Sequence, residues 1–457
     1  MAPTQKKLFG TDGVRGVANH DPMMVEMAVN LARAVAHVLR ERKKGKRPRV
    51  IIGKDTRLSG YMLENALVAG LCSMGADAIL VGTLPTPGIA VLVRDQKADA
   101  GFVISASHNP FEDNGIKLFS CDGYKLPDAE EAEIEAFLHD PAPLLAQLPD
   151  GGLIGKSFRV EDALRRYVDF CKGTFPKGMD LKGARIVLDC GNGATYRAAP
   201  LVFRELGARV TTLHAMPNGL NINAACGSQH TDALREQVIA ERADIGLAFD
   251  GDGDRLIVID ENGVELTGDH ILYACAKALK AKGQLANNLA VATVMSNFGL
   301  NEAMKKEGIR LLRSAVGDRY VLETMQREGG IIGAEASGHM IFLDKHTTGD
   351  GIVSALQLLA VLKEAGVEMS ELAAGMRMYP QKLLNVKLAR KPPIESIAPV
   401  QALIREGETE LGDNGRILVR YSGTQNLCRV MVEGPTEEMT ARICDGIASA
   451  IQAEIGA

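Results

Sequence analysis

The feature that most constrains the fold of this chain is a repeated alternation of short, apolar, β-branched runs with longer helical stretches. It starts with runs at residues 50–53, 78–81 and 101–105, and a helical stretch at residues 60–74 separates the first two. Neighbouring parallel strands need a long crossover between them, which is usually a helix. The alternation therefore predicts mostly parallel sheets.

The same alternation restarts twice and then changes near the C-terminus. Further strands are predicted at residues 185–189, 209–213, 245–249, 256–260, 289–295, 309–312 and 331–333. The tail has predicted strands at residues 383–389, 416–420 and 427–432 and a closing helix at residues 437–451. We therefore expect an α/β chain of three similar domains with mixed, mostly parallel sheets, and a smaller C-terminal α+β domain. The predicted bounds are residues 1–155, 156–259, 260–376 and 377–457.

Length, composition and charge exclude several classes of protein. With 457 residues the chain is too long for one ordinary core, and 46% hydrophobic residues exclude wholesale disorder. The formal net charge of −5 is too small to indicate nucleic acid or an acidic membrane as the main partner. An anionic ligand would therefore need a local basic site.

The N-terminus and the cysteines indicate the compartment. The opening MAPTQKKLFGTDG contains no apolar segment of the secretory kind, and the long uncharged windows are interrupted by polar residues or glycine. Eight cysteines are scattered without a CxxC pair. We therefore expect a cytoplasmic protein with reduced thiols, no membrane span and no zinc site.

Three segments resemble known binding motifs, but each lacks one required residue. GGLIGKS has Asp150 where a nucleotide-binding phosphate loop needs glycine, and DCGNGATY has Tyr196 where a dinucleotide fingerprint needs its third glycine. DGDGDRLIVIDE has Arg255 where an EF-hand needs glycine, and LIVID is a strand pattern. We predict a plain turn, a tight strand-to-helix turn and an acidic loop that is not an EF-hand.

The acidic segment FDGDGDR is the strongest candidate for a metal site. Asp250, Asp252 and Asp254 alternate with Gly251 and Gly253, whose backbone freedom lets the carboxylates approach one another. Such a group of anions repels itself unless a cation lies among them, and oxygen ligands suit Mg²⁺. The alternative, a solvated acidic turn, is disfavoured because apolar strands are predicted on both sides.

Two further segments carry polar residues directly after predicted strands. In ISASHNP the serines are Ser105 and Ser107, at the strand end where α/β active sites gather, although the segment alone also fits a capped turn. The nearby DNGIK adds Lys117 as a cation or proton carrier. In RYSGTQN, Arg420 and the neighbouring hydroxyl and backbone donors predict a phosphate site, with a simple turn as the alternative.

Together these segments resemble the signature loops of the α-D-phosphohexomutase family, in the same order along the chain. SASHNP with DNGIK, DGDGDR, EASGH and RYSGT match one loop per domain, and TDGVRG and KDTRLSG extend the match over nearly the whole chain. LNINAACGSQH and FLDKHTTGDG are most similar to the bacterial branch of the family that acts on glucosamine phosphates.

The resemblance implies a four-domain, heart-shaped molecule whose active site lies in a central cleft. It implies an isomerase that interconverts glucosamine 6-phosphate and glucosamine 1-phosphate through a bound 1,6-bisphosphate, supplying UDP-N-acetylglucosamine for the bacterial cell wall. Ser107 matches the serine that is phosphorylated in the resting enzyme. Mg²⁺ would be held by an oxygen of that phosphate together with Asp250, Asp252 and Asp254. A homodimer is a further expectation.

The resemblance also gives other residues a role by position. The implied catalytic residues are Ser107, His108, Lys117 and Arg15. Lys117, Arg15 and His339 are alternative carriers of the proton or of transition-state charge. The implied substrate-binding residues are Glu335, Ser337, His339, Arg420, Ser422, Gly423 and Thr424.

The chain departs from the family pattern at two places. Gln425 and Asn426 follow SGT where SGTEP is usual, and Gln229 stands where threonine is usual. Two alternative functions stay open. One is a family member that acts on glucose or mannose phosphates, and the other is a catalytically silent sugar-phosphate binder.

Overall fold

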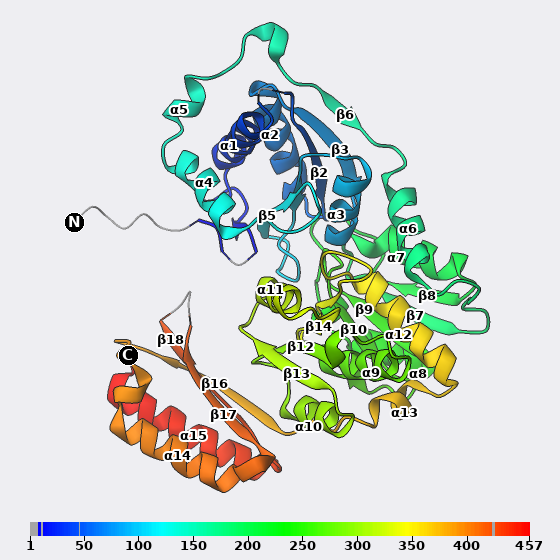
Figure 1. Cartoon of the computed structure of the whole chain (residues 1–457), viewed down its shortest axis with the longest axis vertical. Coiled ribbons are helices and arrows are strands. Elements are labelled where there is room, and N and C mark those ends of the chain that lie inside the picture. Colours follow the sequence, from blue (N-terminus) through cyan, green and yellow to red (C-terminus); the bar gives the residue numbers. More distant parts are fainter. Residues whose placement is uncertain (1–7, 11, 45, 423–425) are drawn as a thin grey trace. The chain divides into compact units, whose positions relative to one another are not determined.

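The computed structural model describes residues 8–10, 12–44, 46–422 and 426–457. The chain divides into two compact units. The larger unit comprises Met1–Val294 and Leu312–Ala373, and the smaller one comprises Met295–Leu311 and Ala374–Ala457. Three α/β regions make up the larger unit, and the smaller unit holds the C-terminal sheet with its helices (Figure 1).

The first region is built on a six-stranded sheet with the order β1-β5-β4-β2-β3-β6. Its strands are β1 (Val14–Val17), β2 (Arg49–Lys54), β3 (Asp77–Thr83), β4 (Ala100–Ile104), β5 (Asp113–Ser120) and β6 (Ser157–Arg159). Its helices are α1 (Val25–Arg42), α2 (Ser59–Ser73), α3 (Thr86–Asp95), α4 (Asp128–His139) and α5 (Ala142–Leu145). β2, β3, β4 and β6 are parallel, whereas β5 runs antiparallel to β4 and β1. Because β5 returns alongside β4, Lys117 pairs with Val103, close to the end of β4 that leads to Ser107.

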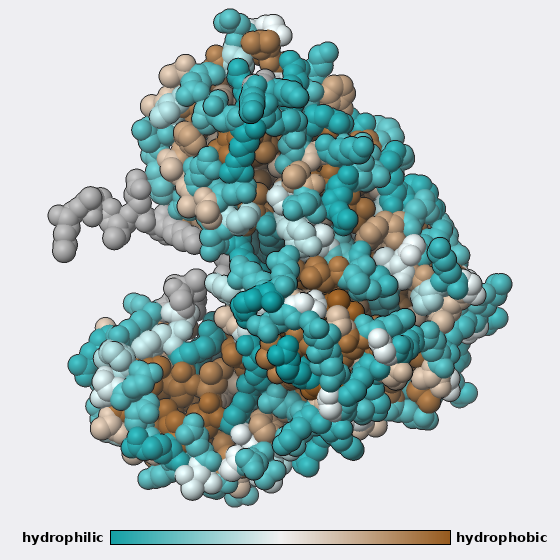
Figure 2. Space-filling model, viewed as in Figure 1, coloured by the Kyte–Doolittle hydropathy of each residue, from teal (hydrophilic) through white to brown (hydrophobic). Residues whose placement is uncertain are grey.

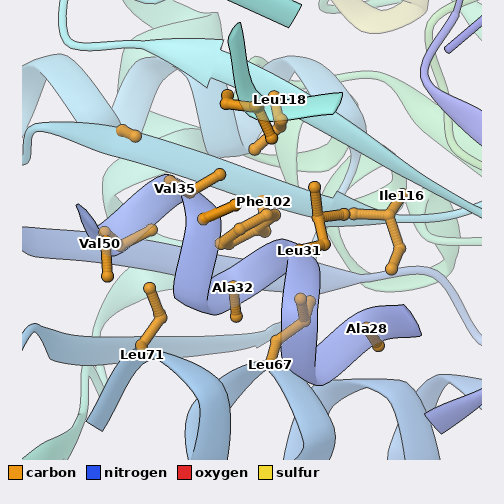
Figure 3. Packing of buried hydrophobic residues seen from close by; sticks show 14 of the residues in the cluster. Ala28, Leu31, Ala32, Val35, Val50, Leu67, Leu71, Phe102, Ile116 and Leu118 are labelled. Atoms are coloured by element: carbon orange, nitrogen blue, oxygen red, sulfur yellow. The ribbon is translucent and has the colours of Figure 1, made fainter. Parts of the chain in front are cut away.

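The core of this region fixes the sheet that carries the Ser107 loop. Leu31 and Val35 of α1, Leu67 of α2 and Phe102 of β4 belong to one buried cluster (Figure 3). Fully burying a side chain of this size contributes about 1.5–3 kcal/mol relative to leaving it exposed. The helices and the strands therefore hold each other in place by packing.

The second region has a five-stranded sheet with the order β11-β10-β9-β7-β8. Its strands are β7 (Arg185–Asp189), β8 (Arg209–Leu213), β9 (Ile245–Phe249), β10 (Leu256–Ile259) and β11 (Glu265–Leu266). Its helices are α6 (Ala163–Thr174), α7 (Thr195–Glu205) and α8 (Asp232–Glu241). β7 is parallel to β8 and β9, and the acidic segment joins the antiparallel pair β9 and β10.

The third region has a four-stranded sheet with the order β13-β12-β14-β15. Its strands are β12 (Leu289–Thr293), β13 (Arg310–Ser314), β14 (Ile332–Ala334) and β15 (Met340–Phe342). Its helices are α9 (Gly268–Ala281), α11 (Asp318–Glu328), α12 (Gly351–Ala365) and α13 (Met369–Ala373). The EASGH segment forms the turn between the antiparallel strands β14 and β15.

The smaller unit contains a three-stranded antiparallel sheet with the order β16-β18-β17. Its elements are α10 (Phe298–Lys306), β16 (Gln381–Lys387), α14 (Ala398–Leu411), β17 (Arg416–Tyr421), β18 (Leu427–Glu433) and α15 (Glu437–Ile455). α14 and α15 cover one face of the sheet (Figure 1), and side chains from the sheet and both helices share one hydrophobic cluster. The short 3₁₀ turns along the described chain are η1 (Gly151–Leu153), η2 (Gly227–Gln229), η3 (Ala286–Asn288), η4 (Ile394–Ser396) and η5 (Gly412–Asn414).

The viewed surface is mainly hydrophilic, with a hydrophobic area over the C-terminal sheet and its helices (Figure 2). Within the described residues, no helix combines the length and the apolar character that crossing a membrane requires.

The predicted fold class is confirmed, and every strand predicted from the sequence exists. Strands β7, β8 and β9 match their predicted bounds residue for residue. The predicted domain bounds stay predictions. β6 lies just after residue 155 and completes the first sheet, and β11 lies just after residue 259 and joins the second. The two glycine-rich segments form the turns that were expected, at η1 and between β7 and α7.

A buried histidine gives the larger unit a predicted acid sensitivity. The His346 ring is 2% exposed, and Thr347 N donates to Nδ1 at 2.8 Å while Nε2 lies 3.0 Å from the Pro87 carbonyl oxygen. This arrangement suits a neutral ring with its proton on Nε2. Burial lowers the pKa of His346 to about 4.

We therefore expect the contribution of His346 to the free energy of unfolding to fall as the pH drops from about 6.5 toward 4. In this window the unfolded chain takes up a proton at His346 and the folded chain does not. Across this window His346 lowers the free energy of unfolding by about 3 kcal/mol in total, because each unit of pKa difference corresponds to about 1.4 kcal/mol. Urea unfolding at pH 7 and pH 5 measures it. His346→Gln should lose this part of the pH dependence, whereas His20→Gln at an exposed histidine should keep it; equal slopes in both variants would contradict the assignment.

Candidate active site

The acidic loop between β9 and β10 gathers three buried carboxylates. Asp250, Asp252 and Asp254 are 0%, 1% and 5% exposed, and one carboxylate oxygen of each lies within 4.8 Å of the others. Two glycines make this approach possible. Gly253 has φ +74°, and a Cβ at Gly251 would lie 2.5 Å from the Ser107 carbonyl oxygen. The loop is therefore pressed directly against the Ser107 loop.

Lys117 supplies the positive charge inside this cluster. Its Nζ lies 2.8 Å from Asp252, 3.0 Å from Asp12 and 3.7 Å from a carboxylate oxygen of Asp254. Burial alone would lower the pKa of Lys117, but the surrounding carboxylates outweigh it and raise that pKa. In contrast, burial and the charges of Asp254 and Asp252 raise the pKa of Asp250 well above its usual value. Three buried carboxyl groups therefore lie close together, with Lys117 and Arg255 as nearby cations.

The residues of the acidic loop fit a hard divalent cation. Asp252 Oδ1 and Asp254 Oδ1 are buried, and neither has a hydrogen-bond partner among the described residues. Buried anionic oxygens without partners are costly unless an ion or a ligand group binds them. Carboxylate oxygens at this density match the ligand preference of Mg²⁺.

Ser107 lies beside this loop, a few residues after the end of β4. Its side chain is 1% exposed, and its Oγ donates to Asp250 Oδ2 at 2.5 Å. The Nδ1 atom of His108 lies 3.4 Å from the same Oγ. Burial, with Arg255 and Arg15 nearby, lowers the pKa of His108 to about 4, so its ring is neutral at pH 7. Ser107 is therefore the hydroxyl that the fold places against the carboxylates.

The backbone at Ser107 is strained and held from several sides. Ser107 has φ +54°, an uncommon value for a residue other than glycine, and such a conformation persists only where its surroundings fix it. Its N–H donates to Ser105 Oγ at 2.9 Å. Its carbonyl oxygen accepts from Arg57 Nη2 and from Asn223 Nδ2, both at 2.9 Å. Arg57 is 0% exposed and also donates to the Asn109 carbonyl oxygen at 2.8 Å.

Sequence reasoning gave no role to Arg57 or Asn223. Both lie in segments that carried the family resemblance, KDTRLSG and LNINAACGSQH. That resemblance was the sequence feature that could have indicated a role for them. Neither segment alone indicates contact with the Ser107 loop, because the contacts join residues that are 50 and 116 positions apart.

We expect Asn223→Ala to lower kcat by roughly ten- to a hundredfold with a smaller change in KM. A reacting group that is displaced by about 1 Å can lose about a hundredfold in rate. Steady-state kinetics would measure the change. Asn218→Ala, at an exposed asparagine of the same loop, is the matched control and should keep wild-type rates. Unchanged kcat in Asn223→Ala would show that Arg57 and Ser105 suffice to hold the serine.

A second charged group extends from the acidic loop to the EASGH turn. Lys125 Nζ donates to Asp12 Oδ1 at 2.5 Å and also contacts Asp318. The His339 ring is 4% exposed, and its Nε2 lies 3.6 Å from Asp318 Oδ2 and 3.9 Å from Asp254 Oδ2. Both ring nitrogens lack a hydrogen-bond partner among the described residues. The sequence did not single out Asp12, Lys125 or Asp318 for this group.

The remaining predicted residues of the larger unit also lie around this group. Arg15 is on β1 and contacts Asp12. Glu335 Oε1 accepts from Gly317 N at 3.0 Å, and Ser337 is half-buried in the same turn. The EASGH turn is bonded to the end of the acidic loop, since Leu256 N donates to the Gly338 carbonyl oxygen at 3.0 Å.

The smaller unit presents a pair of arginines. Arg420 on β17 lies opposite Arg429 on β18, and like charges in this position destabilise a sheet. The Nε atoms of both are buried and have no hydrogen-bond partner among the described residues. Burial and the charge of Arg429 lower the pKa of Arg420. An anion bound beside the two arginines would therefore offset their repulsion. Ser422 follows and is 4% exposed, while Gly423, Thr424 and Gln425 lie outside the described residues.

We expect Arg420→Lys to raise KM about tenfold or more, with a smaller fall in kcat. A guanidinium grips a phosphate through two parallel hydrogen bonds that lysine cannot reproduce. Each charge-assisted bond contributes roughly 1.5–3 kcal/mol. Steady-state kinetics on the glucosamine phosphate that the family resemblance implies measures the effect, with Arg405→Lys on the exposed side of α14 as the control. Wild-type KM in Arg420→Lys would contradict the predicted role of Arg420 in binding phosphate.

Four domain models of one family match the chain in order. They are described as phosphoglucomutase/phosphomannomutase alpha/beta/alpha domain I, domain II, domain III and C-terminal domain, and they match residues 6–142, 165–263, 267–379 and 383–450. The chain belongs to this family.

Curated relatives show which members of the family this chain is similar to. The phosphoglucosamine mutase of Syntrophobacter fumaroxidans is 56% identical over 449 residues, covering 98% of this chain and 99% of that protein. The phosphoglucosamine mutase of Syntrophus aciditrophicus is 56% identical over 451 residues, covering 98% of this chain and 100% of that protein. The match thus extends over all four family domains.

Solved structures share the fold. A phosphoglucomutase/phosphomannomutase family protein from Burkholderia thailandensis has a TM-score of 0.80 at 24% identity, covering 98% of this chain and 97% of the other. Aspergillus fumigatus N-acetylphosphoglucosamine mutase, solved with GlcNAc-6P and magnesium, has a TM-score of 0.66 at 16% identity, covering 99% and 96%. At these identities the likeness shows the fold alone.

Proposed function

We propose that the chain is a phosphoglucosamine mutase that interconverts glucosamine 6-phosphate and glucosamine 1-phosphate. The observation that carries this proposal is the buried hydroxyl of Ser107, 2.5 Å from Asp250 in a cluster of carboxylates. A sugar-phosphate binder needs no nucleophile in such a place. The 56% identity to curated phosphoglucosamine mutases supports the choice of sugar.

In the proposed reaction, Ser107 carries a phosphoryl group in the resting enzyme. The bond between its Oγ and phosphorus breaks as the free sugar hydroxyl forms a new bond to phosphorus and gives up its proton. The product is a bound 1,6-bisphosphate, which reorients. Its other phosphoryl group then returns to Ser107 Oγ and releases the isomeric monophosphate. Lys117, Arg15 and His339 are the candidates for carrying the proton or neutralising charge, and Lys117 stays protonated because of its carboxylate partners.

The proposal includes a Mg²⁺ ion held by Asp250, Asp252, Asp254 and an oxygen of the serine phosphate. When bound, this ion would neutralise charge on the transferred phosphoryl group. The orphaned oxygens of Asp252 and Asp254 support this assignment. Glu335, Ser337 and His339 are proposed to contact the sugar. Arg420, Ser422, Gly423 and Thr424 are proposed to bind the phosphate that does not react.

The test is kcat/KM measured by a coupled assay on several hexose phosphates. We expect glucosamine 6-phosphate to exceed glucose 6-phosphate and mannose 6-phosphate by tenfold or more, a difference of about 1.4 kcal/mol. A preference for glucose or mannose phosphates would assign the chain to another activity of the same family. Tight binding of glucosamine 6-phosphate without turnover would identify a silent binder.

A further inference from the structure

Asp189, His214 and Cys226 come from three segments and meet at one edge of the second sheet. Asp189 is the last residue of β7, His214 directly follows β8, and Cys226 directly precedes η2. β7 and β8 are parallel neighbours, so their carboxyl ends lie together. One ligand atom from each of the three residues lies within 4.8 Å of the others.

The spacing of the His214 and Asp189 ligand atoms is close to that of two ligands in a tetrahedral metal site. His214 Nδ1 lies 3.0 Å from Asp189 Oδ2. Ligand atoms bound to one Zn²⁺ at about 2.0–2.3 Å are roughly 3.3–3.8 Å apart. Small side-chain movements would therefore let all three atoms share one ion.

The surroundings of the three residues resemble those of metal ligands. Asp189 and Cys226 are 0% exposed, while the His214 side chain is 30% exposed and gives access from solvent. Gly191 N donates to Asp189 Oδ1 at 2.8 Å, and Asn192 Nδ2 donates to Cys226 Sγ at 3.9 Å. Hydrogen bonds of this kind orient ligands and tune their affinity.

We propose that Asp189, His214 and Cys226 form a binding site for Zn²⁺ or a similar transition metal. A thiolate, an imidazole and a carboxylate are the ligand types that such ions select, whereas the oxygen-only acidic loop suits Mg²⁺. The sequence-based expectation of no zinc site rested on the absence of a CxxC pair. The three ligands lie too far apart in sequence to form such a motif.

The site is connected to the acidic loop through the turn that follows β7. Ala194 N donates to the Gly251 carbonyl oxygen at 2.8 Å, and a Cβ at Gly193 would lie 2.4 Å from the same oxygen. A metal bound to Asp189 therefore holds the turn against which the acidic loop packs.

The experiment is a Co²⁺ titration of the full-length protein with Mg²⁺ in large excess, so that the acidic loop does not take up the probe. We expect a near-ultraviolet band from thiolate-to-cobalt charge transfer that saturates at one Co²⁺ per chain and disappears when Zn²⁺ is added. Cys226→Ser should remove the band and weaken Co²⁺ binding more than about tenfold. Cys190→Ser, at the neighbouring buried cysteine, and Cys121→Ser, at an exposed one, should keep it.

A second variant covers the case in which Cys226→Ser does not fold. His214→Asn changes a half-buried residue, so folding should be retained by circular dichroism while Co²⁺ affinity falls more than about tenfold. Absence of the band in the wild type, its persistence in Cys226→Ser, or its equal loss in either control would overturn the proposal. The readout is spectroscopic, so it is independent of the proposed mutase activity.

Discussion

Ser107→Ala is expected to lose nearly all mutase turnover, at least about 10³-fold, because the substitution removes the oxygen that would carry the phosphoryl group. The protein should stay folded, since the Ser107 backbone is held by Arg57, Asn223 and Ser105 rather than by its own side chain. Coupled-assay kinetics would measure the loss. Mass spectrometry of peptides from the purified wild-type protein should show partial phosphorylation at Ser107.

Ser107→Gly provides a matched variant. Glycine adopts the observed φ of +54° without strain, so this variant should be inactive and yet no less stable than the wild type. If Ser107→Ala kept its turnover, the nucleophile would have to be sought at Ser105. That residue is a weaker candidate, because its hydroxyl already accepts from Ser107 N and donates to Asp55 Oδ2 at 2.6 Å.

Asp252→Asn is expected to lower kcat by at least about a hundredfold and to change KM much less. A divalent ion contributes several kcal/mol of charge stabilisation during transfer, and each 1.4 kcal/mol corresponds to about tenfold in rate. Asp252 Oδ1 is one of the orphaned oxygens, and Oδ2 accepts from Thr86 Oγ1 at 2.6 Å and from Lys117 Nζ at 2.8 Å. The change would therefore weaken a proposed metal ligand and remove the negative charge that pairs with Lys117.

The measurement is kcat as a function of Mg²⁺ concentration. The variant should need more Mg²⁺ for half-maximal rate. Asp232→Asn is a suitable control because the Asp232 side chain is 85% exposed at the start of α8, where a single surface charge has little effect. Full activity of the wild type after exhaustive chelation would contradict the assigned role of the acidic loop.

The sequence by itself predicted most of the strands and the chemical character of the acidic loop, but it did not predict β1, β5, β6, β11 or β15. Strands β7 and β9 are largely apolar runs and β8 is rich in β-branched residues, and these patterns depend on neighbouring residues alone. The alternation of aspartate and glycine in the acidic loop likewise indicates a metal site without reference to any other segment. Local patterns of this kind can be read from one segment at a time.

The tertiary structure decided which of these loops meet and which partners they find. Lys117 reaches Asp252, 135 positions away, because β5 returns antiparallel beside β4. Arg429 faces Arg420 because of the register between β17 and β18. Asn223 holds Ser107 across 116 positions, and the Asp189, His214 and Cys226 cluster depends on the adjacency of β7 and β8. Strand order, register and close packing bring these groups together, and they depend on how the whole chain buries its apolar surface rather than on any local pattern.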